Sequence, residues 1–174
     1  MIIIISGPPG SGKTTVAKML SEKLNYPLVS SGDLFRSMAK EHNMDIESFS
    51  KFSERNDYID REIDDKILKI MKNDGNIIID SRLAGWFAKR NNIDAFKIYL
   101  NASREKRLER INKREKTSMD DLVLREKSEI KRYKHIYGID FKDLSIYDLV
   151  IDTENLSPED IVNKILESVN KWAK

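Results

Sequence analysis

The sequence predicts an α/β protein of three layers, in which a five-stranded parallel sheet lies between two layers of helices. Five short apolar runs alternate with longer segments in which apolar residues recur every three or four positions. A glycine-rich segment directly follows the first of these runs. Strands that alternate with helices form parallel sheets, because each helix returns the chain to the same end of the sheet.

The first run, Met1–Ile5, is rich in β-branched residues and predicts a strand that is buried on both faces. The loop after it reads Gly7-Pro8-Pro9-Gly10-Ser11-Gly12-Lys13-Thr14 and matches the phosphate-binding pattern G-x-x-x-x-G-K-[ST] at every fixed position. A helical pattern follows, with Val16, Ala17, Leu20 and Leu24 on one face. Strand, loop and helix together predict a P-loop NTPase fold.

This loop has a defined chemistry. Its backbone N–H groups and the helix N-terminus form an anion site, Lys13 reaches the β- and γ-phosphates, and the Thr14 hydroxyl holds Mg²⁺. We therefore expect the chain to bind a nucleoside triphosphate or a close relative.

The remaining elements follow the same alternation. We expect strands over residues 27–30, 76–80, 95–100 and 147–151. Helices are expected from Gly32 to about Lys40, over 46–52, from about Ser103, and after Ser157, which is a capping serine followed by proline. One further helix ends near residues 73–75 and carries an apolar stripe of Ile59, Ile63, Ile67, Ile70 and Met71.

Charged residues follow two more of the predicted strands. Asp33 and Arg36 come after the second strand, and Asp80 and Arg82 end the third. The carboxyl ends of parallel strands meet at one edge, so these side chains should share a cleft with the phosphate loop. Two arginines there suit a second phosphate-bearing substrate. We expect Asp33 and Asp80 to hold water molecules around Mg²⁺, although Asp33 fits equally well as a helix-capping acid.

The segment Arg104–Lys142 is helical in pattern and crowded with arginine. A polar connection at residues 115–120, with Ser118 as a helix cap, predicts a helical hairpin. Interleaved glutamates allow a solvated surface of mixed charge. Phosphoryl transfer, however, uses arginines on a closing flap, which favours a lid. By spacing, one face of the hairpin carries Arg107, Arg110 and Arg114, and another carries Arg125 and Arg132.

Length and composition restrict the class of protein. The 174 residues fit one domain over 1–174, and a net charge of +2 opposes a nucleic-acid or membrane partner. The absence of cysteine excludes disulfides and thiolate catalysis. With no leader and no long apolar span, we expect a cytoplasmic protein, and we expect a monomer.

Several motifs together resemble the nucleoside monophosphate kinases, and more closely the archaeal-type cytidylate kinases. The matching segments are residues 5–15, Ser-Gly-Asp-Leu-Phe-Arg at 31–36, Ser-Arg-Leu-Ala-Gly-Trp at 81–86, Arg-Tyr-Lys-His-Ile-Tyr-Gly-Ile-Asp at 132–140, and Asp-Leu-Ser-Ile-Tyr-Asp-Leu-Val-Ile-Asp-Thr at 143–153. The chain departs from many related kinases at Ser81, where they often have glycine. It also contains no glutamine, the residue that adenylate kinases commonly use for adenine.

The resemblance implies Mg²⁺-dependent phosphorylation of CMP and dCMP by ATP, with an acceptor-binding insertion at about 31–74 and a lid at about 104–142. It implies an ATP site of Gly7, Pro8, Pro9, Gly10, Ser11, Gly12, Lys13, Thr14 and Thr15. It implies an acceptor site of Ser31, Asp33, Arg36, Asp80 and Arg82. The resemblance also implies a set of catalytic residues, namely Lys13, Arg110, Arg114, Arg125 and Arg132.

Three alternatives remain open at this point. The first is a kinase of another small acceptor, such as UMP, dTMP, AMP or shikimate, on the same fold. The second is a slow P-loop ATPase switch, although the Asn-Lys-x-Asp and Asp-x-x-Gly motifs of a GTPase are absent. The third is a nucleic-acid-binding protein, which the net charge and the interleaved glutamates oppose.

Overall fold

The computed structural model describes residues 1–73 and 75–172, and its sheet has five strands. All of the strand pairs are parallel, as the sequence predicts, and the strand bounds differ from the predicted ones by one or two residues. The order across the sheet is β2-β3-β1-β4-β5. The strands are β1 (Ile2–Ser6), β2 (Leu28–Ser30), β3 (Ile77–Asp80), β4 (Phe96–Asn101) and β5 (Leu149–Asp152).

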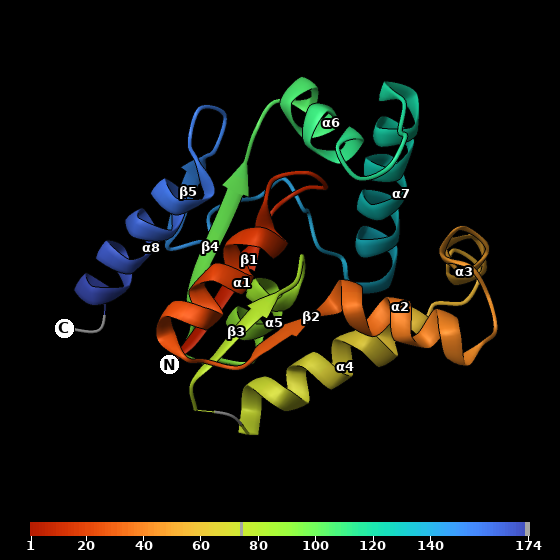
Figure 1. Cartoon of the computed structure of the whole chain (residues 1–174). Coiled ribbons are helices and arrows are strands. Elements are labelled where there is room, and N and C mark those ends of the chain that lie inside the picture. Colours follow the sequence, from red (N-terminus) through yellow and green to blue (C-terminus); the bar gives the residue numbers. More distant parts are fainter. Residues whose placement is uncertain (74, 173–174) are drawn as a thin grey trace.

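Helices cover both faces of this sheet and give the predicted three layers (Figure 1). The short helix α5 was not predicted, because two turns are too few for a helical period to stand out in the sequence. The predicted cap of Ser118 is confirmed, since its side chain accepts a hydrogen bond from the Asp121 backbone N–H. The helices are α1 (Lys13–Leu24), α2 (Ser31–Glu41), α3 (Ile46–Ser53), α4 (Tyr58–Asn73), α5 (Ala84–Arg90), α6 (Arg104–Asn112), α7 (Met119–Tyr137) and α8 (Pro158–Trp172).

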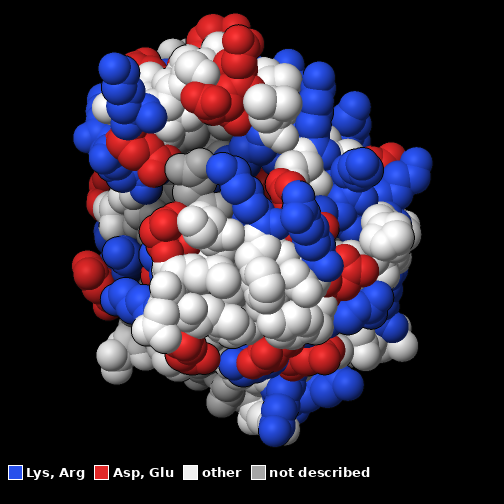
Figure 2. All heavy atoms as spheres, turned by 90° about the vertical axis from the view of Figure 1, so that its right-hand side faces the viewer, with Lys and Arg blue, Asp and Glu red and all other residues white. Residues whose placement is uncertain are grey.

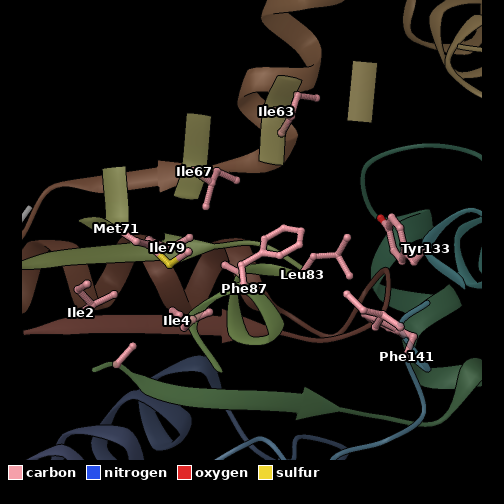
Figure 3. Packing of buried hydrophobic residues seen from close by; sticks show 14 of the residues in the cluster. Ile2, Ile4, Ile63, Ile67, Met71, Ile79, Leu83, Phe87, Tyr133 and Phe141 are labelled. Carbon is pink, nitrogen blue, oxygen red and sulfur yellow. The ribbon is translucent and has the colours of Figure 1, made fainter. Parts of the chain in front are cut away.

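The core divides into two parts because successive strand residues point to opposite faces. Ile3 and Ile5 of the central strand β1 pack with α1 and α8. Ile2 and Ile4 pack on the other side, towards Ile63, Ile67 and Met71 of α4 and Phe87 of α5 (Figure 3). These four isoleucines are at most 6% exposed. Each contributes about 1.5–3 kcal/mol of burial free energy, which is why the N-terminal run forms the centre of the sheet.

The carboxyl ends of β1, β2 and β3 lie side by side. Asp80 is in register with Ile5 of β1 and with Ser30 of β2. The phosphate loop, the start of α2 and the end of β3 therefore meet at one edge, and α6 and α7 lie beyond that edge (Figure 1). The expected end of the acceptor-binding insertion at residue 74 lies outside the described residues.

Within residues 1–73 and 75–172, no helix is both long enough and apolar enough to cross a bilayer.

Candidate active site

The phosphate loop adopts a backbone that only glycine tolerates. Gly7, Gly10 and Gly12 have φ angles of 150°, 77° and 94°. A Cβ atom at Gly7 would lie 2.2 Å from the Leu100 carbonyl oxygen, and one at Gly10 would lie 2.5 Å from the Arg107 carbonyl oxygen. The loop is therefore wedged between the end of β4 and the start of α6, and its shape depends on glycine at these positions.

Lys13 lies over this loop, where its Nζ donates to the Pro8 carbonyl oxygen at 3.1 Å. The pKa of Lys13 is lowered to about 7, mainly by burial and also by the positive charges of Arg82 and Arg125, while the Asp80 carboxylate opposes the shift. Positive charges that repel one another in this way favour the binding of an anion among them. The arrangement thus prepares a site for phosphate.

Thr14 and Asp80 meet across the sheet edge. The Thr14 hydroxyl donates to Asp80 Oδ2 at 2.7 Å, and Ser30 Oγ lies 3.4 Å from the same oxygen. Hydroxyl and carboxylate oxygens are the ligands that Mg²⁺ prefers. No cluster of three or more His, Asp or Glu residues that could hold a metal occurs within the described part of the chain. A magnesium ion here would depend on oxygens of the nucleotide, as Mg²⁺ sites in kinases commonly do.

The expected acceptor residues lie at the ends of β2 and β3. Ser31 Oγ donates to the Asp80 carbonyl oxygen at 3.3 Å. Arg82 is almost buried, and burial is the main reason why its pKa falls to about 10. Arg36 and Asp33 form an exposed ion pair of 2.5 Å on the first turns of α2. The role of Asp33 around Mg²⁺ stays a prediction, since the contact that the structure shows for Asp33 is with Arg36.

Two of the expected lid arginines, Arg110 and Arg114, belong to α6 and the connection that follows it. The first is held by hydrogen bonds and the second is exposed. Arg110 donates to the Thr153 carbonyl oxygen at 2.7 Å and to its hydroxyl at 2.9 Å, and it lies 3.5 Å from the Ser11 carbonyl oxygen. It is thereby fixed between the phosphate loop and the end of β5. Arg114 is exposed in the connection between α6 and α7.

The two arginines of α7 lie in different surroundings. Arg125 Nε is 3.6 Å from Glu129, which also pairs with Arg82. Arg82 and Arg125 are therefore joined through one carboxylate, and the charges of both lower the pKa of Lys13. Arg132 instead contacts Asp60 of α4, with Nε 3.1 Å from Oδ2.

Sequence reasoning did not assign a site role to Arg107, which is 5% exposed. It donates to the carbonyl oxygens of Pro9 and Ala102, both at 3.1 Å, and pairs with Glu126 at 2.5 Å. The spacing of Arg107 and Arg110 places both on one helix face, and this spacing is the feature of the sequence that could have indicated a shared role. That this face packs on the phosphate loop follows only from the tertiary structure.

Charge on the face that carries α3 and α7 is mixed. Figure 2 shows Lys and Arg interspersed with Asp and Glu around a continuous uncharged area. A broad field of one sign, which binding to a polyanion requires, is not present on this face.

Known proteins resemble this chain in sequence over its whole length. The cytidylate kinase of Methanocaldococcus jannaschii is 46% identical over 100% of both chains. The cytidylate kinase of Sulfurisphaera tokodaii is 44% identical over 97% of this chain and 94% of its own. A family model described as an AAA domain matches residues 3–134.

Solved structures resemble the fold at low sequence identity. A shikimate kinase from Bacteroides thetaiotaomicron has a TM-score of 0.68 at 16% identity and covers 98% of both chains. A gluconokinase from Sinorhizobium meliloti has a TM-score of 0.67 at 14% identity, covering 98% of this chain and 92% of its own. At these identities the likeness concerns the fold, which is the predicted three-layer fold of P-loop kinases.

Proposed function

The chain belongs to the cytidylate kinase family, and on this basis we propose that it transfers the γ-phosphoryl group of ATP to CMP or dCMP. The products are ADP and CDP or dCDP. The observation that carries the proposal is that Lys13 lies on the phosphate loop, within electrostatic reach of Arg82 and Arg125, which both contact Glu129. Phosphoryl transfer needs positioning and positive charge around the migrating group, and these residues offer both.

The donor half of the site uses the phosphate loop, residues 7–15. Its backbone N–H groups and Lys13 bind the triphosphate, as the loop pattern requires. Thr14 would hold Mg²⁺ directly and Asp80 would hold it through water, in keeping with their 2.7 Å contact. When bound, Mg²⁺ neutralises charge on the β- and γ-phosphates. We place Arg110 and Arg114 on the ATP side of the lid.

The acceptor half uses the ends of β2 and β3. We propose that Arg82 and Arg36 bind the acceptor phosphate, helped by Ser31 and by Asp33, which orients Arg36 through their ion pair. Arg82 is suited to this role because its guanidinium is fixed and nearly desolvated, which strengthens a bidentate bond to phosphate. Segment 31–73 would then be the acceptor-binding part of a single domain.

The lid, residues 104–142, completes the site. We assign stabilisation of the migrating phosphoryl to Arg125, which contacts the carboxylate that pairs with Arg82 and whose charge lowers the pKa of Lys13. The sequence also predicts a catalytic role for Arg132, which forms an ion pair with Asp60 in this structure, and that role stays a prediction. Because every expected group comes from one chain, we propose that the protein is a monomer. We also propose that it is located in the cytoplasm.

A coupled assay of ADP release tests the function. The acceptors are CMP, dCMP, UMP, dTMP, AMP and shikimate, each with ATP and Mg²⁺. We expect kcat/KM to be highest for CMP or dCMP and ADP release to be negligible without an acceptor. Equal ATP turnover with and without CMP would instead indicate an ATPase switch. A clear preference for another acceptor would retain the kinase and overturn the CMP assignment.

A further inference from the structure

Two glutamates on α7 connect the lid helix to the two halves of the site, beyond the sheet edge (Figure 1). Glu126 and Glu129 lie three residues apart on one face of the helix, and each side chain is 12% exposed. Glu126 pairs with Arg107, which donates to the Pro9 carbonyl oxygen of the phosphate loop. Glu129 pairs with Arg82 at the end of β3. One glutamate is therefore linked to the donor half and the other to the acceptor half.

Glu129 contacts two cations that the proposed mechanism needs for phosphate groups. Its carboxylate pairs with Arg82, which we assign to the acceptor phosphate. It also lies 3.6 Å from Nε of Arg125, which we assign to the migrating phosphoryl. Because Arg82 is only 14% exposed, a carboxylate beside it replaces much of the water that would otherwise solvate its charge. The mechanism proposed above gives Glu129 no role.

Arg82 lies close to the donor half of the site as well. It follows Asp80 by two residues, and Asp80 accepts a hydrogen bond of 2.7 Å from the Thr14 hydroxyl on the first turn of α1. The charges of Arg82 and Arg125 also lower the pKa of Lys13 on the phosphate loop. Whatever neutralises these two arginines therefore changes the field at the lysine that we assign to the triphosphate.

A kinase that holds ATP must avoid transfer of the γ-phosphoryl group to water. In that side reaction a water oxygen forms a bond to the γ-phosphorus, and the bond from this phosphorus to the bridging oxygen breaks. ADP leaves with the electron pair, one water proton stays on the inorganic phosphate, and the other passes to solvent. Arginines that stabilise transfer to an acceptor also stabilise this reaction, because the same charge develops on the migrating group.

We propose that Glu129 makes cleavage of ATP depend on the acceptor and so protects ATP from water. This inference rests on the function proposed above. Without an acceptor, Glu129 holds Arg82 and Arg125, and the γ-phosphoryl group lacks their charge. The acceptor phosphate carries more negative charge than a carboxylate and has three oxygens for hydrogen bonds, so it displaces Glu129 and releases both arginines. Glu129 is thus a specificity-determining residue that acts through these arginines.

The experiment measures ATP hydrolysis without an acceptor and phosphoryl transfer with saturating CMP in the wild type, Glu129→Gln and Glu126→Gln. Glu129→Gln keeps the shape of the side chain and removes the charge that holds the arginines. We expect its kcat for hydrolysis to rise by about 10-fold, which is a part of the effect of one preorganised donor. Its kcat for transfer should change by less than about 3-fold, because CMP already displaces Glu129 in the wild type. The ratio of transfer to hydrolysis should therefore fall by about 10-fold.

Glu126→Gln is the matched control. Glu126 is equally buried and lies one turn away, but its partners are Arg107 and Arg104. A lid that is merely loosened would lower transfer and hydrolysis together and would leave their ratio unchanged. We expect an unchanged ratio for Glu126→Gln. An unchanged ratio in a folded Glu129→Gln overturns the inference and leaves the proposed function standing.

A measurement on the wild type gives an independent decision if Glu129→Gln does not fold. Phosphite is a small dianion that resembles the acceptor phosphate without its nucleoside. It should displace Glu129 and stimulate ATP hydrolysis, whereas cytidine, which carries no phosphate, should not. A lack of stimulation by phosphite, up to the concentration at which it competes with ATP, overturns the inference. A wild-type enzyme that hydrolyses ATP as fast without CMP as with it overturns the proposed function, and this inference with it.

Discussion

Arg82, at the end of β3, and Glu129, on the lid helix α7, form an ion pair whose side chains are 14% and 12% exposed, respectively. Glu129 also lies 3.6 Å from Arg125. One carboxylate thus neutralises two arginines that we assign to phosphate groups. If a substrate phosphate binds these arginines as we propose, it replaces this carboxylate, so we expect Glu129 and the acceptor to compete for the same cations.

Glu129→Gln should tighten CMP binding because it removes that competing charge. We expect the Kd for CMP, measured by calorimetry, to fall by about 3–10-fold, while the melting temperature falls because buried Arg82 loses its anion. Glu109→Gln on α6 is the control, since Glu109 pairs only with half-buried Lys106 and exposed Lys113 in the contacts that the structure describes. Weaker CMP binding in Glu129→Gln would show that Glu129 supports the acceptor site.

Arg125→Ala should lower kcat by about 10²–10³-fold, by comparison with the loss of one preorganised donor to a developing charge. Its effect on either KM should be small, because the contact that we propose is stronger in the transition state than with bound substrates. Steady-state kinetics with ATP and CMP measures both. Lys127→Ala, two residues further along α7, should be near normal. A near-normal kcat in Arg125→Ala would support the solvated-charge interpretation of the lid.

Arg107→Met should destabilise the protein and weaken ATP binding together. The change removes hydrogen bonds to Pro9 and Ala102 and leaves Glu126, which is 12% exposed, with only its outer partner, Arg104. The free energy of unfolding in urea should fall by about 2–5 kcal/mol. Arg104→Met is the matched control, because Arg104 pairs with the same carboxylate but is 55% exposed, and its loss should cost under about 1 kcal/mol. Similar costs for both would contradict an anchoring role of Arg107.

ATP binding should take up a proton at Lys13. Its pKa in the ligand-free protein is about 7, so at pH 8 most molecules carry a neutral amine. The triphosphate raises this pKa, and we expect an uptake of roughly one proton per ATP at pH 8, decreasing to about half a proton at pH 7 and towards zero at lower pH. Calorimetry in buffers of different ionisation enthalpy measures it. Lys13→Met should abolish both the uptake and the activity while the protein remains folded; an unchanged uptake would assign the proton elsewhere.

Asp64→Asn should change how stability depends on pH. Burial raises the pKa of Asp64 from 3.8 to about 7, so between these values the folded state holds a proton that the unfolded state lacks. Folded-state stability is therefore lost as the pH rises through this window, and the asparagine variant lacks that loss. The advantage of Asp64→Asn over the wild type should grow by about 1–3 kcal/mol from pH 4 to pH 7. Asp65→Asn, its exposed neighbour, should show no such change.

The elements near the phosphate loop could be predicted from sequence because their causes are local. A β-branched run specifies β1, positive φ angles demand Gly7, Gly10 and Gly12, and the strand–loop–helix order allows one interpretation of Lys13 and Thr14. The convergence of Asp80 with Thr14 also follows, since parallel strands place their carboxyl ends together. The family could be predicted from the sequence because the motifs that carry the resemblance occur in order along the chain.

The partners of Arg107 and Arg132 were decided by the tertiary structure, whereas Arg125 contacts Glu129 one helical turn away. Sequence spacing places Arg107, Arg125 and Arg132 on helices where several acidic residues are equally close along the chain, and pairs within one exposed helix differ by only a few tenths of a kcal/mol. Burial separates them: Arg107 pairs with Glu126 under the phosphate loop, and Arg132 pairs with Asp60, which lies 72 positions away in sequence. Which charges lose their water depends on how α6 and α7 pack on the sheet edge and on α4, and that packing is a property of the whole fold.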